Sequence, residues 1–532
     1  MKLAGGSATF FSLGPSRRNV LAQMTKAGEE PKANELRTDV AVIGAGPGGL
    51  AAALHAAELG LGVLLFEKRD KTGGARNGGM GPFGAGTHLQ EKYGVKNCTT
   101  KDAFNYLMDF NHWRTDARLT SEFINYTAFT VKWLEDQGLL FSPMGEAAKG
   151  AGVPKIVDSG YVHIFARHPD YPKESFYACS LLTDRARAKK NIQIFLQTPV
   201  KNLSKTGDKV TGLVAQDASG KELQVKAKAV IIITGGFSGN PEMIKKYTNF
   251  TYGKDLFATF EMPNLSGDGI RMAWDAGAAR AEMMMGVYKG IPIYGGPEGT
   301  KNEWSILARP NLMVNLSGQR FLNEAHSDRY MTANMIHRQP DGCGFMIFDT
   351  TIADIYRNLK SDSGLGVPDM AAPIHDVDII IAEAKKLNYP YLFAADSIED
   401  LCRQTGINLH GIKATIAEYN SFCKVGNDPI YYKDSPNLLP LYGPKYYAST
   451  WCCDNFGGVG GIRINSKTEV LNTNLEPIPG LYAGGHDANT MYADTYPAYE
   501  SGNFSSFAYT TGLLAAKNAA EYIKSLVRTG SR

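Results

Sequence analysis

Glycines with a characteristic spacing follow the first long apolar run of the 532-residue chain. Gly44, Gly46 and Gly49 form the pattern G-x-G-x-x-G with a further glycine at Gly48, and Glu67 closes a second apolar run 18 residues after Gly49. Such a pattern permits a tight turn, close approach of the backbone to a pyrophosphate and close packing of the next helix, while the acid accepts hydrogen bonds from ribose hydroxyls. The spacing therefore predicts a strand, an Ala-rich helix and a second strand around a dinucleotide site.

Three later segments carry further glycine pairs that can reach the same ligand. Their motif residues are Lys68 with Gly73, Gly74, Gly78 and Gly79; Thr234 with Gly235; and Gly485 with His486 and Asp487. These segments resemble the E-K-x(4)-G-G, A-T-G-G and I-P-G-L-Y-A-A-G segments of FAD-dependent reductases. The resemblance implies FAD rather than NAD as the ligand.

The resemblance extends over residues 37–532. Residues 265–270, 314–324 and 456–459 are similar to the A-T-G-D-G, V-N-x-x-G-x-R-F-x-N-E and M-G-G-V motifs of one flavoprotein superfamily. That superfamily contains fumarate reductase, succinate dehydrogenase, urocanate reductase and 3-ketosteroid Δ1-dehydrogenase. It implies an α/β fold in which a Rossmann-type, discontinuous FAD-binding domain carries an inserted α+β capping domain. The limits that we expect are a flexible tail over 1–36, the FAD-binding domain over 37–283 and 455–532, and the capping domain over 284–454.

The resemblance also implies which residues hold FAD. They are Gly44, Gly46, Gly48, Gly49, Glu67, Lys68, Gly73, Gly74, Gly78, Gly79, Val200, Thr234, Gly235, Asp268, Gly485, His486, Asp487, Gly502, Asn503 and Phe504. Either His486 or Asp487 is expected at the flavin ribityl chain, and the positive end of the last helix is expected to stabilise negative charge on the flavin. No attached histidine precedes the Gly78-Gly79 pair, so we expect FAD to be non-covalent. Because no haem or FMN motif is found, we expect an external donor such as NAD(P)H, a reduced flavin carrier or an electron-donor protein.

Four positions that carry anion-gripping cations in fumarate-type relatives hold other residues here. The resemblance places Tyr288 and Asp454 at two histidine positions, Tyr499 at the clamping arginine and Asp328 at the acid arginine. A dianion would meet a carboxylate and hydroxyls, and one like-charge contact in a poorly solvated site costs several kcal/mol. We therefore predict that fumarate, succinate and urocanate are not substrates. A neutral cyclic or aromatic molecule is favoured, with the two tyrosines as pocket wall.

The groups that move the proton and hold the substrate oxygen are predicted from the same comparison. Tyr496 lies in a T-Y-P segment that resembles the ketosteroid branch, where the tyrosine hydrogen-bonds the substrate ketone. Asp328, Arg329 or Tyr330 follows the R-F-x-N-E segment and is the predicted proton donor. The alternatives are a solvated ion pair for Asp328 with Arg329 and core packing for Tyr330.

These residues predict an FAD-dependent oxidoreductase that reduces an activated C=C bond of a neutral ring substrate. A steroid enone or an isoflavonoid fits this description, with hydride from flavin N5 and a proton from a side chain. The first alternative is a 3-ketosteroid Δ1-type dehydrogenase that runs in the oxidative direction. The second alternative is a non-catalytic flavin protein that relays electrons.

Composition and charge exclude several other classes of protein. The chain has 56 Lys and Arg against 53 Asp and Glu, a net charge of +3, so neither a nucleic-acid groove nor a polybasic membrane surface is expected. Seven cysteines form no C-x-x-C pair, so neither a zinc site nor an iron–sulfur cluster is expected.

Cysteine number and hydropathy bear on the compartment. The odd number of cysteines favours a reducing environment over a disulfide framework, and the neighbouring Cys452 and Cys453 are expected to be structural. The longest apolar stretch, residues 40–66, contains glycines, a proline and charged residues, so it is not predicted to span a membrane. The arginine pair at residues 17–18 lacks the apolar run of an export signal. We therefore expect a cytoplasmic protein.

Overall fold

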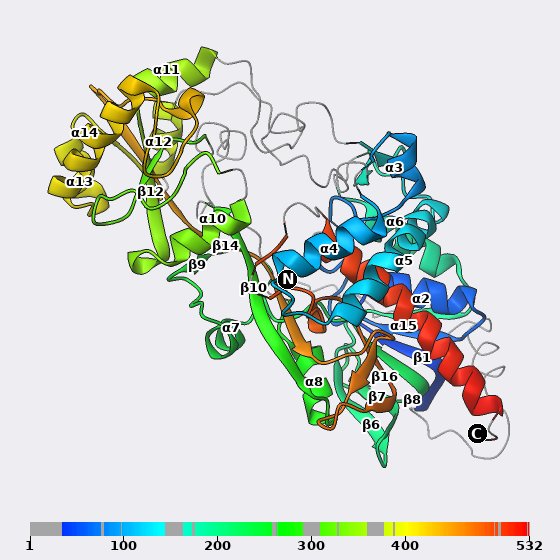
Figure 1. Ribbon diagram of the computed structural model, residues 1–532. Helices are drawn as coiled ribbons and strands as arrows, with labels where there is room; N and C mark the ends of the chain where they lie inside the picture. Colours follow the sequence, from blue (N-terminus) through cyan, green and yellow to red (C-terminus); the bar gives the residue numbers. More distant parts are fainter. Residues whose placement is uncertain are drawn as a thin grey trace, which may run out of the picture.

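The computed structural model contains two groups of elements that are joined by two long strands (Figure 1). It describes residues 35–75, 79–96, 98–143, 163–172, 176–257, 262, 264–290, 309–326, 329–358, 377–386, 389–493, 495–497, 502–528 and 530. No helix among these residues has both the length and the hydrophobicity that a membrane crossing requires.

The first group is built on an eight-stranded sheet with a parallel core. Its strands are β1 (Glu35–Ile43), β2 (Val63–Phe66), β5 (Ile192–Phe195), β6 (Val200–Thr206), β7 (Lys209–Gln216), β8 (Glu222–Ile232), β15 (Glu469–Leu471) and β16 (Pro477–Ala483). The order is β15-β16-β8-β1-β2-β5, and β7 and β6 extend it from β8 as an antiparallel meander. The strands β16, β8, β1, β2 and β5 pair in parallel, so their carboxyl ends meet at one edge. Three of the glycine-rich turns follow these strand ends.

Helices cover both faces of this sheet. The first face carries α2 (Pro47–Glu58), α5 (Ala117–Asp136), α6 (Ala178–Ala188) and α15 (Asn503–Arg528) over a core of leucines, alanines and tyrosines. The second face carries α7 (Pro241–Tyr247) and α8 (Asp268–Asp275). The helices α3 (His88–Lys92) and α4 (Thr100–Phe110) lie between β2 and α5 in the chain. A Cβ atom on Gly512 would lie 2.2 Å from the Gly48 carbonyl oxygen, so α15 can approach α2 this closely only with glycine there.

The second group is built on a six-stranded sheet around one long strand. Its strands are β9 (Leu256–Phe257), β10 (Arg280–Gly290), β11 (Leu312–Val314), β12 (Cys343–Asp349), β13 (Leu392–Ala395) and β14 (Tyr446–Ile462). The helices in this part are α10 (Arg329–His337), α11 (Thr350–Asn358), α12 (Val377–Lys386), α13 (Ile398–Thr405) and α14 (Leu409–Val425). A separate hairpin pairs β3 (Phe141–Ser142) with β4 (Ile164–Phe165). The amino-terminal half of β14 pairs with β12 and β13, and its carboxyl-terminal half pairs with β10.

Both long strands cross the domain limits that the sequence suggested. The limit at 283/284 lies inside β10, and the limit at 454/455 lies inside β14. The two strands are hydrogen-bonded from Met283 opposite Gly460 to Gly290 opposite Cys452, apart from one register shift at Gly286. Both strands belong to the six-stranded sheet and run through the expected limits without interruption. The exact domain limits stay a prediction.

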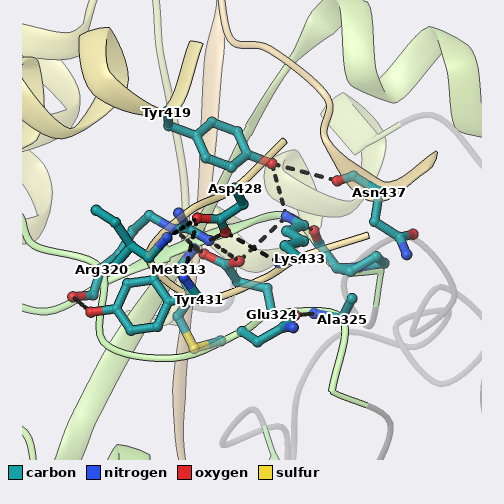
Figure 2. A network of polar contacts seen from close by, with 12 residues as sticks. Met313, Arg320, Glu324, Ala325, Tyr419, Asp428, Tyr431, Lys433 and Asn437 are labelled. Atoms are coloured by element: carbon teal, nitrogen blue, oxygen red, sulfur yellow. Dashed lines mark hydrogen bonds and ion pairs between the residues drawn. The ribbon is translucent and has the colours of Figure 1, made fainter. Parts of the chain in front are cut away.

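The R-F-x-N-E motif forms a buried ion network in the second group (Figure 2). Arg320 donates two hydrogen bonds of 2.9 Å to Glu324 and one of 2.8 Å to Asp428. The Lys433 ammonium lies 3.4 Å from Glu324 and donates to the Tyr419 hydroxyl at 2.8 Å. These four charges sum to zero, which is the condition under which buried charges are tolerated. Burial lowers the pKa of Lys433 despite the neighbouring Glu324.

The structure contains one disulfide that the sequence did not predict. A disulfide joins Cys343 to Cys452, and the other five cysteines are free thiols. The two partners lie directly opposite each other in the antiparallel pairing of β12 with β14, and their Cα atoms are 4.5 Å apart. That register is a property of the sheet, so the odd cysteine number could not reveal the pair. Cys453 points to the other face of β14, where its thiol donates to the Ala333 carbonyl.

Candidate active site and cofactor cradle

The first glycine turn has the shape that a phosphate group requires. Gly44 has φ +102°, and an added Cβ would lie 2.5 Å from the Ile233 carbonyl oxygen. An added Cβ on Gly49 would lie 1.8 Å from the Gly44 carbonyl oxygen, so both positions must be glycine for this turn to form. Gly46 differs, because an added Cβ there would meet only Gly74 at 3.6 Å. The protein therefore leaves the Gly46 side of the turn open.

The start of α2 lies at this open side. Its N-cap residue is Gly46, no side chain caps the helix, and no acidic residue occupies its first turn. The first backbone N–H groups of a helix lack intrahelical partners and carry partial positive charge. Gly73 donates its N–H to the Ala45 carbonyl at 2.9 Å, which holds the Gly73-Gly74 pair beside the turn. The observed cradle fits a diphosphate.

Two predicted cofactor residues tie this cradle together. Glu67 is buried and accepts hydrogen bonds from the backbone N–H groups of Ala45 at 2.9 Å and Arg69 at 3.0 Å. Lys68 lies 2.8 Å from Asp268 and donates to Ser266 at 2.6 Å, which connects the end of β2 to the start of α8. Although burial acts in the opposite direction, the hydrogen bonds from Lys68 and Ser266 hold the pKa of Asp268 below its usual value.

The structure distinguishes between His486 and Asp487. The Asp487 carboxylate accepts hydrogen bonds from Thr234 and from the backbone N–H groups of Gly235 and Gly236, so it closes the turn after β8. Burial raises the pKa of Asp487 in spite of these hydrogen bonds. The His486 ring remains partly accessible and packs edge-on against Phe504, with ring centroids 4.7 Å apart. Burial lowers the pKa of His486 to about 4, so its imidazole is neutral at neutral pH.

The start of α15 is pinned to the segment that follows Gly79. Gly502 has φ +82°, and an added Cβ would lie 2.6 Å from the Gly81 carbonyl oxygen. Ser505 donates to the same carbonyl at 2.9 Å. The Asn503 backbone N–H donates to the Tyr496 hydroxyl at 3.0 Å. Gly79, Gly502 and Asn503, which are far apart in the sequence, therefore lie together.

Five aromatic side chains form a continuous row that leads away from this helix start. The aromatic row consists of Tyr288, Tyr330, Phe456, Tyr496 and Phe504. Its inner contacts place Tyr496 4.6 Å from Phe504, 4.7 Å from Tyr330 and 5.0 Å from Phe456, measured between ring centroids. Tyr288 lies at the far end, 5.9 Å from Phe456 and 6.2 Å from Tyr330. Tyr330 and Phe456 are partly exposed, so their rings are the accessible members of the row.

A buried tyrosine–aspartate pair closes the far end of the row. The Tyr288 hydroxyl donates to the Asp454 carboxylate at 2.6 Å, and the two residues are 5% and 2% exposed. They lie opposite each other in the pairing of β10 with β14. The sequence singled out both residues separately because of their matched positions. Their contact depends on strand register, which no local signal in the sequence specifies.

The other predicted site residues divide into two groups. Val200 opens β6 and is buried in the core on the second face of the first sheet. Arg329 opens α10, but its side chain lies outside the described part of the structure, as do Gly78, Asp328 and Tyr499. The structure therefore brings together Tyr288, Tyr330, Asp454 and Tyr496 of the predicted catalytic set, and it leaves the others as predictions.

A cation that the sequence did not single out lies beside the pair, on the opposite face of the strand. Lys289 follows Tyr288, so alternation along β10 directs its side chain to the other face. Its ammonium lies 5.1 Å from the centre of the Trp451 ring. Among the described residues, no group of three or more His, Cys, Asp or Glu side chains is arranged to hold a metal ion.

Comparison with known proteins identifies the relatives of this site. Residues 39–502 match the family described as FAD binding domain. The chain is 29% identical over 502 residues to a vinyl phenol reductase of Lactiplantibacillus plantarum, covering 91% of this chain and 96% of that protein. It is 27% identical over 496 residues to a fumarate reductase (cytochrome) of Shewanella frigidimarina, covering 91% and 77%.

A solved structure supports the fold. The 3-ketosteroid Δ1-dehydrogenase of Sterolibacterium denitrificans in complex with 1,4-androstadiene-3,17-dione superposes with a TM-score of 0.72 at 21% identity, and covers 91% of this chain and 99% of that chain. The predicted superfamily and the predicted fold class, an α/β FAD-binding fold with a capping domain, are confirmed.

Proposed function

This chain belongs to the FAD-binding domain family and is an FAD-dependent oxidoreductase that acts on C=C bonds, and from this premise we propose that it reduces an activated C=C bond of a neutral, ring-containing substrate that carries an oxygen. Steroid enones, isoflavonoids and vinyl phenols all meet this description. The vinyl phenol reductase aligns over nearly its whole length, which supports an aromatic member of the class.

The observation that carries the proposal is the composition of the aromatic row and its buried end. Tyr288, Tyr330 and Tyr496 present rings and hydroxyls, and Asp454 adds a carboxylate rather than a cation. Aromatic surfaces stabilise apolar rings by burial and stacking, whereas a dianion beside a poorly solvated carboxylate is repelled by several kcal/mol. This supports the exclusion of dicarboxylates on electrostatic grounds.

FAD fits the cradle that the described residues form. The open turn at Gly46 with the uncapped start of α2 would hold the diphosphate, Glu67 the ribose, and His486 the ribityl chain, because Asp487 is already engaged with the turn after β8. When bound and reduced, FAD supplies a hydride to the substrate carbon. The partly positive start of α15 would stabilise negative charge on the bound cofactor.

The chain's own side chains orient the substrate and move the proton. The Tyr496 hydroxyl accepts a hydrogen bond from the Asn503 backbone N–H, which holds the hydroxyl at the start of α15 for contact with a substrate oxygen. Tyr330 is partly exposed beside it and is the donor among the described candidates, with Asp328 and Arg329 as the adjacent alternatives. NAD(P)H, a reduced flavin carrier or another protein would reduce the bound FAD again. The proposed compartment is the cytoplasm.

The test is anaerobic reoxidation of the reduced, FAD-loaded protein. Fumarate, 4-androstene-3,17-dione, an isoflavone and 4-vinylphenol are added separately, and flavin absorbance and product are followed. We expect reoxidation by at least one ring substrate and none by fumarate at a comparable rate. Turnover of fumarate alone would overturn the proposal. Oxidation of a saturated ketosteroid with an artificial dye, without any reduction, would favour the dehydrogenase, and no reoxidation at all would favour the electron relay.

A further inference from the structure

Asp454 lies at the buried end of the aromatic row, next to Tyr288. The Tyr288 hydroxyl already donates to it at 2.6 Å from β10. Tyr389, in the segment before β13, is close enough for the Asp454 charge to add to the effects of burial and of Tyr391 in raising the pKa of Tyr389. Gly290 packs against Asp454 so closely that an added Cβ would lie 2.7 Å from the Asp454 Cβ, which fixes the carboxylate in place. The site therefore shows a fixed carboxylate that accepts a hydrogen bond from one phenol group, that of Tyr288.

The accessible rings of the row lie between the buried pair and the cofactor cradle. The accessible rings of Tyr330 and Phe456 lie 6.2 and 5.9 Å from the Tyr288 ring. At the other end of the row, Phe504 contacts His486 of the cofactor cradle. A single substrate ring that packs on Tyr330 and Phe456 thus has the cofactor side on one flank and the buried pair on the other.

The sign of the charge at this end separates two kinds of alkene. Reduction of an enone by hydride builds negative charge on the carbonyl oxygen, which requires hydrogen-bond donors or cations there. A hydroxyaryl alkene is electron-rich, and it accepts hydride only after an alkene carbon has been protonated and electron density has been released from the ring oxygen. That oxygen must then lose its proton, which requires a base. The Asp454 carboxylate can serve as this base, and its negative charge disfavours an enolate.

We propose that Asp454, together with Tyr288, binds and deprotonates a phenolic hydroxyl, so that the substrates are hydroxyaryl alkenes such as 4-vinylphenol. This proposal rests on the proposed function and narrows its substrate class. The phenol O–H bond breaks and its proton passes to Asp454, directly or through the Tyr288 hydroxyl. An acid of the chain, Tyr330 or its neighbours, protonates the terminal alkene carbon, which leaves a quinone methide. The bound, reduced cofactor would supply a hydride to the benzylic carbon. The phenolate then recovers its proton from Asp454, so that one hydride and one proton are added in total.

The experiment compares a phenol with its methyl ether in wild type and in two variants. The FAD-loaded protein is tested with 4-vinylphenol and 4-methoxystyrene, which differ by the phenolic proton, and with 2-cyclohexenone as an enone. Asp454→Asn keeps an acceptor for Tyr288 but removes the base. We expect it to lower kcat on 4-vinylphenol by about 10²–10⁴-fold with KM changed only a few-fold. Tyr288→Phe keeps the base and is expected to act mainly on KM.

A second tyrosine–aspartate contact, between Tyr447 of β14 and Asp378 of α12, provides the controls. The Tyr447 hydroxyl lies 3.3 Å from both oxygens of Asp378, at the far end of β14 from the aromatic row. Tyr447→Phe and Asp378→Asn should leave the preference for the phenol over its ether unchanged. A loss of that preference in the control variants would indicate a general effect on the sheet.

A binding measurement keeps the inference testable if Asp454→Asn does not fold. Oxidised wild-type protein is titrated with 4-ethylphenol and 4-ethylanisole, and perturbation of the flavin absorbance is followed. We expect the phenol to bind at least tenfold more tightly. Equal affinities, or equal turnover of 4-vinylphenol and 4-methoxystyrene, would overturn the inference. Reduction of the enone alone would overturn it while the broader function stood, whereas failure of every ring substrate would defeat both.

Discussion

The buried ion network allows a stability prediction with a sign and a size. The network comprises Arg320, Glu324, Asp428 and Lys433, and the side chains of Glu324, Asp428 and Lys433 are fully inaccessible (Figure 2). Glu324→Gln removes one negative charge and leaves two buried cations, Arg320 and Lys433, with a single carboxylate, Asp428. Breaking a buried pair in this way costs about 3–5 kcal/mol. In a domain of 150–250 residues this corresponds to a decrease in Tm of roughly 6–20 °C.

The measurement is thermal unfolding followed by tryptophan fluorescence, because Trp451 lies in the core of this part of the protein. The matched control is Glu399→Gln, which removes an exposed ion pair with Lys413 and should not change Tm measurably. A second arm uses the double substitution Arg320→Met with Glu324→Met. It leaves Asp428 and Lys433 as a balanced pair, so it should cost less than the sum of the two single substitutions. Wild-type stability of Glu324→Gln, or full additivity in the double variant, would refute this account of the motif.

Three further predictions follow from the first sheet, the cysteines and His486. Gly512→Ala places a Cβ 2.2 Å from the Gly48 carbonyl oxygen, so it should separate α15 from α2 and reduce the amount of FAD bound per protein. Bound FAD is measured by absorbance after gel filtration. The control, Ser525→Ala at an exposed position of the same helix, should bind as much FAD as wild type. Thiol titration of denatured protein should detect five thiols without reductant and seven after reduction; seven in both conditions would show that the Cys343–Cys452 disulfide is absent. The pKa of His486 is about 4 in the folded state and 6.5 in the unfolded state, so the unfolded state binds more protons between these pH values. His486 should therefore lower the free energy of unfolding by up to ~3 kcal/mol as the pH falls from 6.5 to 4. His486→Gln should flatten that part of the profile of the FAD-free protein relative to wild type, since Asp487 is common to both, and an unchanged slope would contradict the assignment.

The sequence by itself determined the features that depend on local backbone geometry and on residue type. The G-x-G-x-x-G turn was predictable because Gly44 and Gly49 have no room for a Cβ, and that constraint acts within a few residues. The split FAD-binding fold and the family were predictable from several such segments together, and both are confirmed. The absence of cations at the positions that bind the anion in fumarate-type relatives was also predictable, since it depends only on the identity of residues such as Tyr288 and Asp454.

Only the tertiary structure decided which distant groups meet. Tyr288 and Asp454 are 166 residues apart, and Cys343 and Cys452 are 109 apart, yet both pairs follow from the register of β14 with its two neighbours. Register is set by the packing of whole sheets, so single residues carry no signal for it. The same holds for Asp487, whose carboxylate turns toward the end of β8 while the neighbouring His486 ring stays partly accessible. Residue types thus specify the available chemistry, and the long-range pairing of strands specifies which groups share it.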